Sequence, residues 1–274
     1  MTLIDIFQYG FIQRALIAGS LIAVLCAVLG VFLVLRRLSL IGDGLAHVTF
    51  GGVALALFVN VHPLMVTLAA IPLVMLASLG ILALMERAKI FGDAAVGIVA
   101  SLGIAIGVLL AGLSGGFSVD LFSYLFGNIL SVSREEVIIA ALLFLLIITV
   151  VSLYYHELLA VTFDEELART SGINTRRVNT LLALLTSLVV VLAMKLAGIM
   201  LVSSLIVLPA VTALQIATGF RTALMLSAAC ALLSVVAGII TSFTLNIPAG
   251  ATIILINFCL FLSAFLGRGL VRQR

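Results

Sequence analysis

Residues 14–35 read RALIAGSLIAVLCAVLGVFLVL, an apolar stretch with a single charged residue, Arg14. An α-helix needs about 20 apolar residues to cross the hydrocarbon core of a bilayer. The rest of the chain is similar, since 64% of the 274 residues are hydrophobic and 9% are charged, and the mean hydropathy is +1.42. Soluble domains have about 45–50% apolar and about 25% charged residues. The sequence therefore predicts an all-α, polytopic transmembrane helical bundle embedded in a lipid bilayer.

Nine stretches are long and apolar enough to span the membrane, and broken or re-entrant helices could make the number eight or ten. The candidate spans are 14–35, 39–60, 63–86, 93–113, 135–156, 178–195, 197–218, 222–244 and 249–267. The segment 117–133 is too polar for a span and is predicted to be interfacial or re-entrant. Because no stretch resembles a separate soluble domain, we expect residues 1–274 to form a single transmembrane domain.

The basic residues predict how the chain is oriented, because Lys and Arg are concentrated in cytoplasmic loops. With nine spans and the N-terminus outside, eleven of the fourteen Lys and Arg residues lie on the inner side. The outer side then holds Arg14, Arg134 and Lys195, and the ammonium group of Lys195 is expected to extend to the outer surface. The predicted topology is N-terminus out and C-terminus in. The net charge of +3 reflects this topology and gives no reason to expect a nucleic-acid partner.

Helix-breaking residues interrupt several predicted spans, at Gly51-Gly52, Pro72 and Pro209. Such breaks survive in lipid where neighbouring groups or a cavity satisfy the backbone. The break at Pro209 would mark a discontinuous helix beside a central path, or an ordinary kink used for packing. Four residues are candidates for lining a path, although helix packing explains them equally well. They are Asn128, Ser203, Ser204 and Pro209.

The stretch Gly42-Asp43-Gly44-Leu45-Ala46-His47 places an acid and an imidazole four residues apart near the start of an apolar span. On a helix this spacing puts both side chains on one face. Ionisable groups inside a membrane segment are costly and usually mark a function, and this pair of oxygen and nitrogen donors suits a divalent first-row metal ion. Alternatively, Asp43 could cap its own helix and His47 could be a hydrogen-bonded core histidine.

The largest inner loop, residues 156–177, contains Asp164-Glu165-Glu166-Leu167-Ala168 followed by Gly172. Thr162 or Asp164 can cap a short helix, acids occupy its first turn, and Gly172 can end it in the left-handed conformation. This helix would be a docking element for a cytoplasmic partner or a solvated connector.

The same run resembles the coupling-helix signature of ATP-binding-cassette importer permeases. Other segments strengthen the resemblance because they occur in the right order: LSLIGDGLAH at 38–47, DAAVGI at 93–98, LFGNIL at 125–130, AMKLAG at 193–198 and LPA at 208–210. Together they resemble the zinc/manganese permease family of bacterial importers over about residues 12 to 266. Gly44 departs from this resemblance, since alanine is more usual there.

The resemblance implies the membrane-spanning permease subunit of an ATP-driven importer, in the cytoplasmic (inner) membrane of a bacterium. Such a permease works as two copies with a cytoplasmic ATP-binding subunit and an extracellular metal-binding protein. It implies that Asp43 and His47 bind the metal ion in transit, and that Asp164, Glu165, Glu166, Leu167, Ala168 and Gly172 couple to the ATPase. The chain has no G-x-x-x-x-G-K-[ST] sequence, so we expect a transport subunit and not an enzyme. Apart from the transported ion, no permanently bound cofactor is expected.

The segment Ala193-Met194-Lys195 favours zinc among members of this family, with manganese or iron as alternatives. A nitrogen/oxygen site binds zinc more tightly than manganese, so selectivity is expected to come from the extracellular donor.

Two other functional classes remain as rivals. An ion-coupled secondary transporter or channel would use Asp43 and His47 as a relay. An intramembrane aspartyl protease would need two facing aspartates, for which Asp43 and Asp93 are the candidates, although Asp93 lies at a predicted helix entrance.

Overall fold

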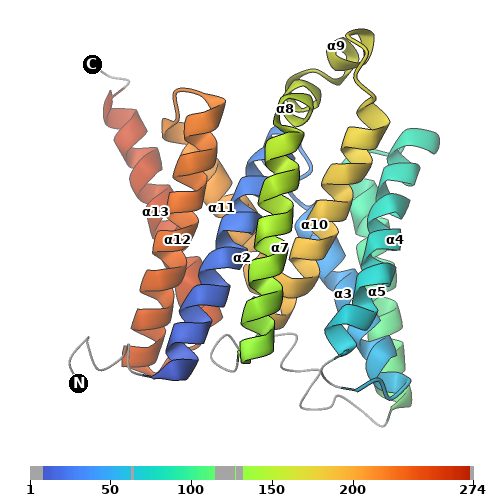
Figure 1. Cartoon of the computed structure of the whole chain (residues 1–274), viewed down its shortest axis with the longest axis vertical. Coiled ribbons are helices and arrows are strands. Elements are labelled where there is room, and N and C mark those ends of the chain that lie inside the picture. Colours follow the sequence, from blue (N-terminus) through green and yellow to red (C-terminus); the bar gives the residue numbers. More distant parts are fainter. Residues whose placement is uncertain (1–8, 63–64, 115–126, 128–131, 272–274) are drawn as a thin grey trace.

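A computed structural model describes residues 9–62, 65–114, 127 and 132–271, and every regular element within these ranges is an α-helix. In chain order the helices are α2 (Gly10–Leu35), α3 (Ile41–Phe58), α4 (Val66–Arg87), α5 (Gly92–Leu113), α7 (Arg134–Leu153), α8 (Tyr155–Phe163), α9 (Glu165–Thr170), α10 (Thr175–Ala197), α11 (Ile199–Ile216), α12 (Phe220–Leu245) and α13 (Ala249–Val271). The long helices stand side by side, roughly along one direction (Figure 1). The prediction of an all-α helical bundle is confirmed.

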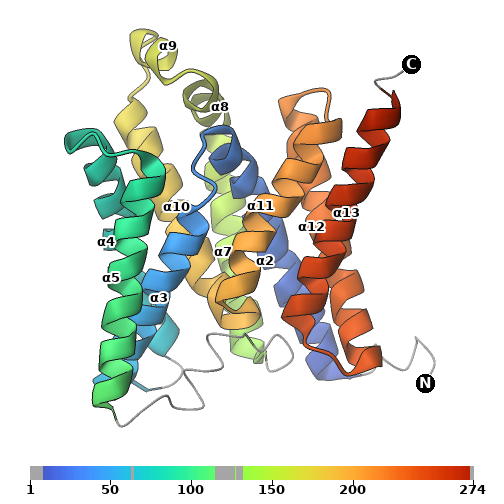
Figure 2. The ribbon, with the colours of Figure 1, turned by 180° about the vertical axis from the view of Figure 1, so that it is seen from behind.

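Eight of the described helices are long and apolar enough to cross a membrane, and α11 contributes a shorter apolar run, Leu201–Ile216. These nine helices correspond one to one with the nine predicted spans. Successive long helices run in opposite directions, so the start of α2 and the end of α13 lie at opposite ends of the bundle (Figures 1 and 2). The segment 117–133, expected to be interfacial, lies almost wholly outside the described residues.

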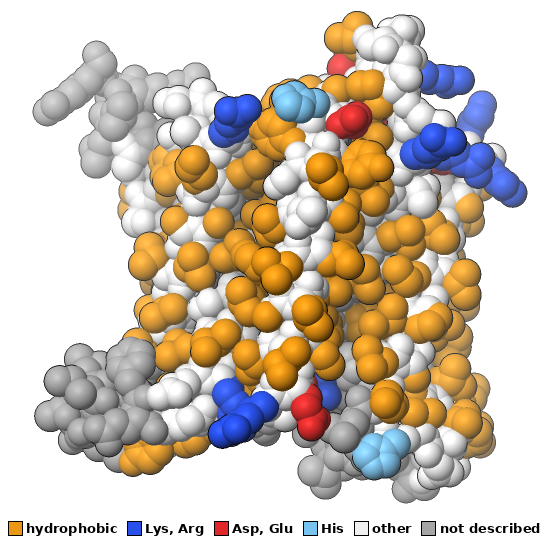
Figure 3. Space-filling model, in the orientation of Figure 1, with side chains coloured by type: hydrophobic (Ala, Val, Ile, Leu, Met, Phe, Trp, Pro, Cys, Tyr) orange, Lys and Arg blue, Asp and Glu red, His pale blue; other side chains and the backbone are white. Residues whose placement is uncertain are grey.

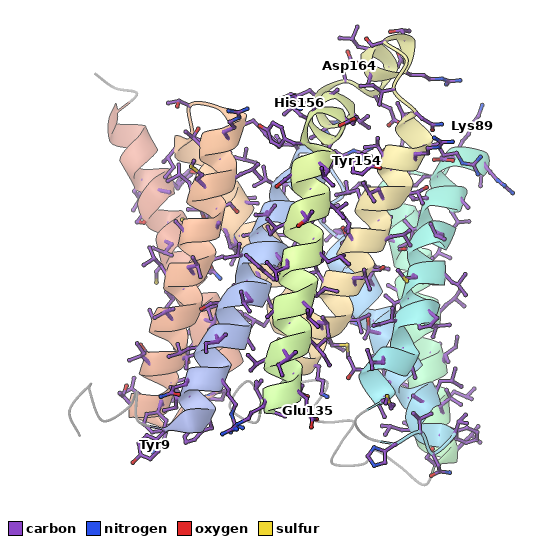
Figure 4. The ribbon with its side chains drawn as sticks, in the orientation of Figure 1. Tyr9, Lys89, Glu135, Tyr154, His156 and Asp164 are labelled. Carbon is purple, nitrogen blue, oxygen red and sulfur yellow. The ribbon has the colours of Figure 1, made fainter. Side chains whose placement is uncertain are left out.

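The two ends of the bundle differ in the residues that they carry. Lys89, Tyr154, His156 and Asp164 lie at the end that carries α9, which we call the α9 end, whereas Tyr9 and Glu135 lie at the opposite end (Figure 4). Between the ends the visible surface is largely apolar, and Lys and Arg side chains gather toward both ends (Figure 3). An apolar belt with charged ends is what a helical bundle needs in order to sit in a bilayer.

Helix α2 runs through the middle of the bundle, between α7, α11 and α12 (Figures 1 and 2). Its side chains Leu25, Leu29, Phe32 and Leu33 are almost fully buried. A helix that is apolar on all sides is typical of a buried position. Gly30 permits close packing against α11, because a Cβ there would lie 2.0 Å from the carbonyl oxygen of Ile206.

The chain breaks where α10 ends and α11 begins, and not at the predicted breaking residues. Gly198 separates these two helices and adopts φ of +79°, a conformation that costs glycine little. Helix α11 continues through Pro209, and α4 continues through Pro72. Helix α3 also continues through Gly51-Gly52. Position 51 requires glycine because a Cβ there would lie 2.6 Å from the carbonyl oxygen of Gly103 on α5. These glycines serve close helix packing.

At the end opposite α9, Lys195 does not extend freely to the surface as the sequence suggested. Its ammonium forms an ion pair with Glu136, and the two side chains are 23% and 19% exposed. Glu136 also closes a capping box, because it accepts from the Ser133 backbone N–H at 2.8 Å while its own N–H donates to Ser133 Oγ. The ion pair therefore joins the start of α7 to the last turn of α10.

Candidate functional site

Helix α3 carries Asp43 and His47 one turn apart on one face, as the spacing predicted. His47 Nε2 lies 3.6 Å from Asp43 Oδ2, and the two side chains are 26% and 47% exposed. This separation is too long for a hydrogen bond between them, but it makes the two groups close neighbours on one face of α3. The polar pair is thus accessible while the adjoining residues Leu45 and Ala46 are fully buried.

The alternative that Asp43 caps its own helix is wrong. The N-cap residue is Leu40, no side chain bonds to the first turn, and Asp43 lies within that turn. A carboxylate in the first turn is still favoured by the partial positive charge of the helix N-terminus. Its oxygen atoms, however, are not used to cap the backbone and are available to other groups.

Ser203 on α11 contacts this pair directly. Its Oγ donates a hydrogen bond of 2.9 Å to Asp43 Oδ1. The two helices approach closely here, because a Cβ on Gly42 would lie 2.5 Å from Cδ1 of Ile206. The hydroxyl fixes one carboxylate oxygen and leaves Oδ2 facing the His47 imidazole. Three polar side chains from two helices therefore form the candidate site.

The other predicted path residues are less informative. Ser204 follows Ser203 on α11 and is partly buried, and Pro209 is buried further along the same helix. Asn128 lies outside the described residues. Within the ranges that the structure describes, no three His, Cys, Asp or Glu side chains gather closely enough to hold a metal ion. One chain thus offers two candidate ligands, the carboxylate of Asp43 and the imidazole of His47, which would be an incomplete set for a first-row metal ion.

The predicted coupling segment forms the short helix α9 at the α9 end of the bundle (Figure 4). Asp164 caps it, accepting a hydrogen bond of 2.9 Å from the Leu167 backbone N–H, and Gly172 follows the helix with φ of +88°. Both features were predicted from the sequence. Glu166 is exposed, Leu167 is 64% exposed and Ala168 is buried. The helix therefore presents a mixed acidic and apolar surface away from the bundle.

Glu165, by contrast, is bound to groups inside the bundle. Its Oε1 accepts from Asn179 Nδ2 at 2.9 Å, and its Oε2 lies 3.6 Å from Arg36 Nη2. Arg36 and Asn179 were not among the predicted site residues. The available signal was weak: an asparagine inside the span 178–195 and an arginine at the end of 14–35.

Comparisons with known proteins agree on one family. The sequence model described as the ABC 3 transport family matches residues 8–268. The chain is 32% identical to the manganese transport system membrane protein MntC of Halalkalibacterium halodurans, covering 95% of this chain and 88% of that protein. It is 30% identical to the high-affinity zinc uptake system membrane protein ZnuB of Haemophilus influenzae, covering 93% and 96% respectively.

A third relative is the probable metal transport system membrane protein of Treponema pallidum, 35% identical over 91% of this chain and 92% of that protein. Among solved structures, PsaBC from Streptococcus pneumoniae in complex with Fab matches with a TM-score of 0.85 and 32% identity. The match covers 96% of this chain and 94% of that chain.

Proposed function

The chain belongs to the ABC 3 transport family, and from this premise we propose that it carries zinc from an extracellular binding protein into the cytoplasm. It is a permease subunit of an ABC metal importer of the manganese/zinc type, in the cell membrane of a bacterium. The observation that carries the proposal is the joint placement of Asp43, His47 and Ser203. They supply oxygen and nitrogen donors inside an apolar bundle, where ionisable groups are otherwise avoided.

The incomplete ligand set supports assembly as two copies. If Asp43 and His47 from two chains meet on a two-fold axis, two carboxylates and two imidazoles surround one ion. Four such ligands satisfy the tetrahedral preference of zinc. Both side chains are partly exposed in a single chain, which is what a shared site requires. A transit site must also release its ion, and a ligand set divided between two mobile subunits suits that purpose.

The segment Ala193-Met194-Lys195 favours zinc as the cargo, and the affinity of the site itself does not select among the candidate ions. Affinity for a given nitrogen/oxygen site increases from manganese through iron to zinc. The printed names of the relatives include both manganese and zinc systems. We therefore attribute selection among these ions mainly to the extracellular donor, with manganese or iron as the alternative cargo.

ATP hydrolysis is assigned to a separate cytoplasmic subunit that docks on α9. The support is the capped helix itself, with Glu166 and Leu167 turned to the outside. Nine basic residues of the described ranges lie at the α9 end of the bundle, namely Arg36, Arg37, Arg87, Lys89, Arg169, Arg176, Arg177, Arg221 and Arg268. Their number favours this end as the cytoplasmic one, which gives the N-terminus out and the C-terminus in.

The decisive experiment is metal uptake into vesicles that contain the transporter assembled with its ATP-binding subunit and supplied by its binding protein. Zinc, manganese and iron are offered separately to wild type and to an Asp43→Asn/His47→Gln double variant. These substitutions keep the side-chain sizes but remove the carboxylate and the imidazole. We expect ATP-dependent zinc uptake in wild type and uptake at background level in the double variant.

Asp93→Asn is the matched control, because Asp93 is likewise an acid after glycine in the first turn of a span, and it is exposed. Uptake by this control should match wild type. Normal uptake by the double variant would refute the ligand assignment. Faster uptake of manganese or iron than of zinc by wild type would show that zinc is not the preferred cargo. Uptake without ATP would favour an ion-coupled transporter or channel.

A further inference from the structure

Three polar side chains from three parts of the chain meet beside α9. Arg36 Nη2 donates to Asn179 Oδ1 at 2.5 Å, and Asn179 Nδ2 donates to Glu165 Oε1 at 2.9 Å. Arg36 Nη2 also lies 3.6 Å from Glu165 Oε2. The amide of Asn179 thus bridges the guanidinium and the carboxylate, and the cluster satisfies both ends of that amide.

This cluster is buried on the side of the bundle and open on the side of α9. Asn179 is 8% exposed and the Arg36 side chain 10%, whereas the Glu165 side chain is 50% exposed. Burial lowers the pKa of the Arg36 guanidinium from its ordinary range, and the nearby charge of Glu165 partly offsets this effect. Arg36 is thus a buried charge whose close partner is the Asn179 oxygen, while the half-exposed Glu165 carboxylate lies further away.

A cavity of about 220 Å³ adjoins the cluster, between α2, α4 and α10. Arg36, Asn179 and Glu165 line it together with apolar residues such as Leu33 and Leu182. This open space leaves room for the Glu165 side of α9 to shift, whereas Ala168 on the same helix is 3% exposed and packs against the bundle. Beside this space the polar contacts connect α9 to α10 and to the end of α2.

The cluster leads to the candidate metal site along two routes. Arg36 begins the tight turn between α2 and α3, in which Arg37 adopts φ of +58° and Leu38 N–H bonds to the Leu33 carbonyl at 2.9 Å. Helix α3, with Asp43, starts at Ile41 directly after this turn. Asn179 lies on α10, which ends at the break at Gly198, and α11 with Ser203 begins directly after this break.

We propose that Arg36, Asn179 and Glu165 are positioning residues that transmit displacement of α9 to the α2–α3 turn and to α10, and so to the two helices that hold the metal ion. The inference rests on the proposed importer function and identifies the residues through which force from the ATPase reaches the transit site. The rigid elements on each side, a short hydrogen-bonded turn and a long helix, are suited to pass on such a displacement.

The first test measures zinc moved per ATP hydrolysed in vesicles that contain the assembled transporter. Glu165→Ala removes the link at its exposed end, and Asn179→Asp keeps the acceptor for Arg36 but sets a second carboxylate against Glu165. We expect each variant to lower the ratio by about 2- to 30-fold, the range for substitutions that alter energetic coupling. Glu165→Gln retains the acceptor for Asn179, so its ratio of zinc moved per ATP should be closer to wild type than that of Glu165→Ala.

Glu86→Gln is the matched control. Glu86 lines the same cavity and pairs with Arg176 Nε at 3.7 Å, but this pair joins α4 to α10 and does not include α9. The ratio for this variant should equal that of wild type.

A second readout is independent of the metal. Spin labels at Ser39→Cys and Met225→Cys report the distance between the α2–α3 turn and α12, in a background without Cys26, Cys230 and Cys259. Met225 is 67% exposed on α12, which is not part of the proposed link to α9. We expect ATP to change this distance in wild type and in Glu165→Gln, but not in Asn179→Asp.

The two readouts distinguish the proposed link through Arg36, Asn179 and Glu165 (the relay) from the proposed importer function. If ATP changes the distance in wild type but the transporter moves no metal, the proposed metal cargo is refuted while the link from α9 remains supported. The relay would be overturned if ATP left the distance unchanged in wild type. It would also be overturned if Glu165→Ala and Asn179→Asp kept the wild-type ratio of zinc moved per ATP.

Discussion

At the scale of single residues, the carboxylate of Asp43 is divided between two tasks. Its Oδ1 accepts from Ser203, and its Oδ2 faces His47. A hydrogen bond from outside the ligand shell orients a ligating group and raises the affinity for the metal. In the proposed site, Ser203 would therefore act on the ion through Asp43 and not as a ligand itself.

Ser203→Ala is therefore expected to weaken metal binding without abolishing it, by about 10- to 100-fold in affinity. The measurement is the zinc concentration for half-maximal uptake. Thr212→Val is the control on the same helix, because the Thr212 hydroxyl bonds to the Leu208 carbonyl of its own helix at 2.7 Å and is not part of the site. An unchanged half-maximal concentration in Ser203→Ala would remove Ser203 from the site.

Residues of the site that are close in sequence could be predicted together, whereas residues far apart in sequence could not. Asp43 and His47 are neighbours on one helix, so their spacing alone predicted the pair. Ser203 is 160 residues from Asp43, and Asn179 is 143 residues from Arg36. Hydropathy indicates which segments cross the membrane, but it does not indicate which helix faces meet. Ser203 was therefore predicted only as a possible path-lining residue, and Arg36 and Asn179 were not predicted at all.

At the scale of helices, α3 is held against α5 by glycines on both sides of the contact. A Cβ on Gly103 would lie 2.7 Å from Cα of Val48 and 2.8 Å from the carbonyl oxygen of His47. A Cβ on Gly107 would lie 2.5 Å from the ring of Phe50. Small residues let helices approach closely in a membrane, where packing and not the hydrophobic effect drives association. The backbone that carries His47 is thus supported directly by α5.

Gly103→Ala is expected to destabilise the protein by about 1–3 kcal/mol, the usual cost of adding a group to a packed contact. The readout is the midpoint of thermal unfolding of the purified protein in detergent. Gly97→Ala adds the same methyl group to the same helix in open space, because no other atom lies within 4 Å of its Cβ position. It should leave the midpoint unchanged or raise it. Equal midpoints for the two variants would contradict the close packing of α3 and α5.

The helices themselves were largely predictable because length and hydropathy determine a membrane span. The positions at which helices are interrupted were not predictable, because they depend on backbone conformation. Pro209 was expected to mark either a discontinuous helix or an ordinary kink; α11 runs through it, which excludes the discontinuity, and the chain turns at Gly198. The short α9 was predicted correctly, since its Asp164 cap and Gly172 terminus are local features of the sequence.

At the scale of the whole molecule, the nine long helices within the described ranges alternate in direction and separate the two ends of the bundle. Ser114 follows α5 at the end opposite α9, and Ser171 follows α9 itself. Both side chains are exposed. The proposed orientation places Ser114 outside the cell and Ser171 in the cytoplasm.

Labelling of single cysteines checks this orientation. In a chain whose Cys26, Cys230 and Cys259 are replaced, a membrane-impermeant thiol reagent should modify Ser114→Cys in intact cells. It should modify Ser171→Cys only after the cells are permeabilised. The reverse pattern would invert the topology and would place α9 out of reach of a cytoplasmic ATPase.

The positions of the first and last described helix ends limit how two copies can be joined. Because the start of α2 and the end of α13 lie at opposite ends (Figure 1), a hydrophilic linker between tandem copies would have to pass through the bilayer. Without that passage, the second half of such a single-chain concatemer would insert upside down and could not mirror the first. A concatemer with one additional hydrophobic helix in its linker restores the parallel arrangement, whereas simple end-to-end fusion does not.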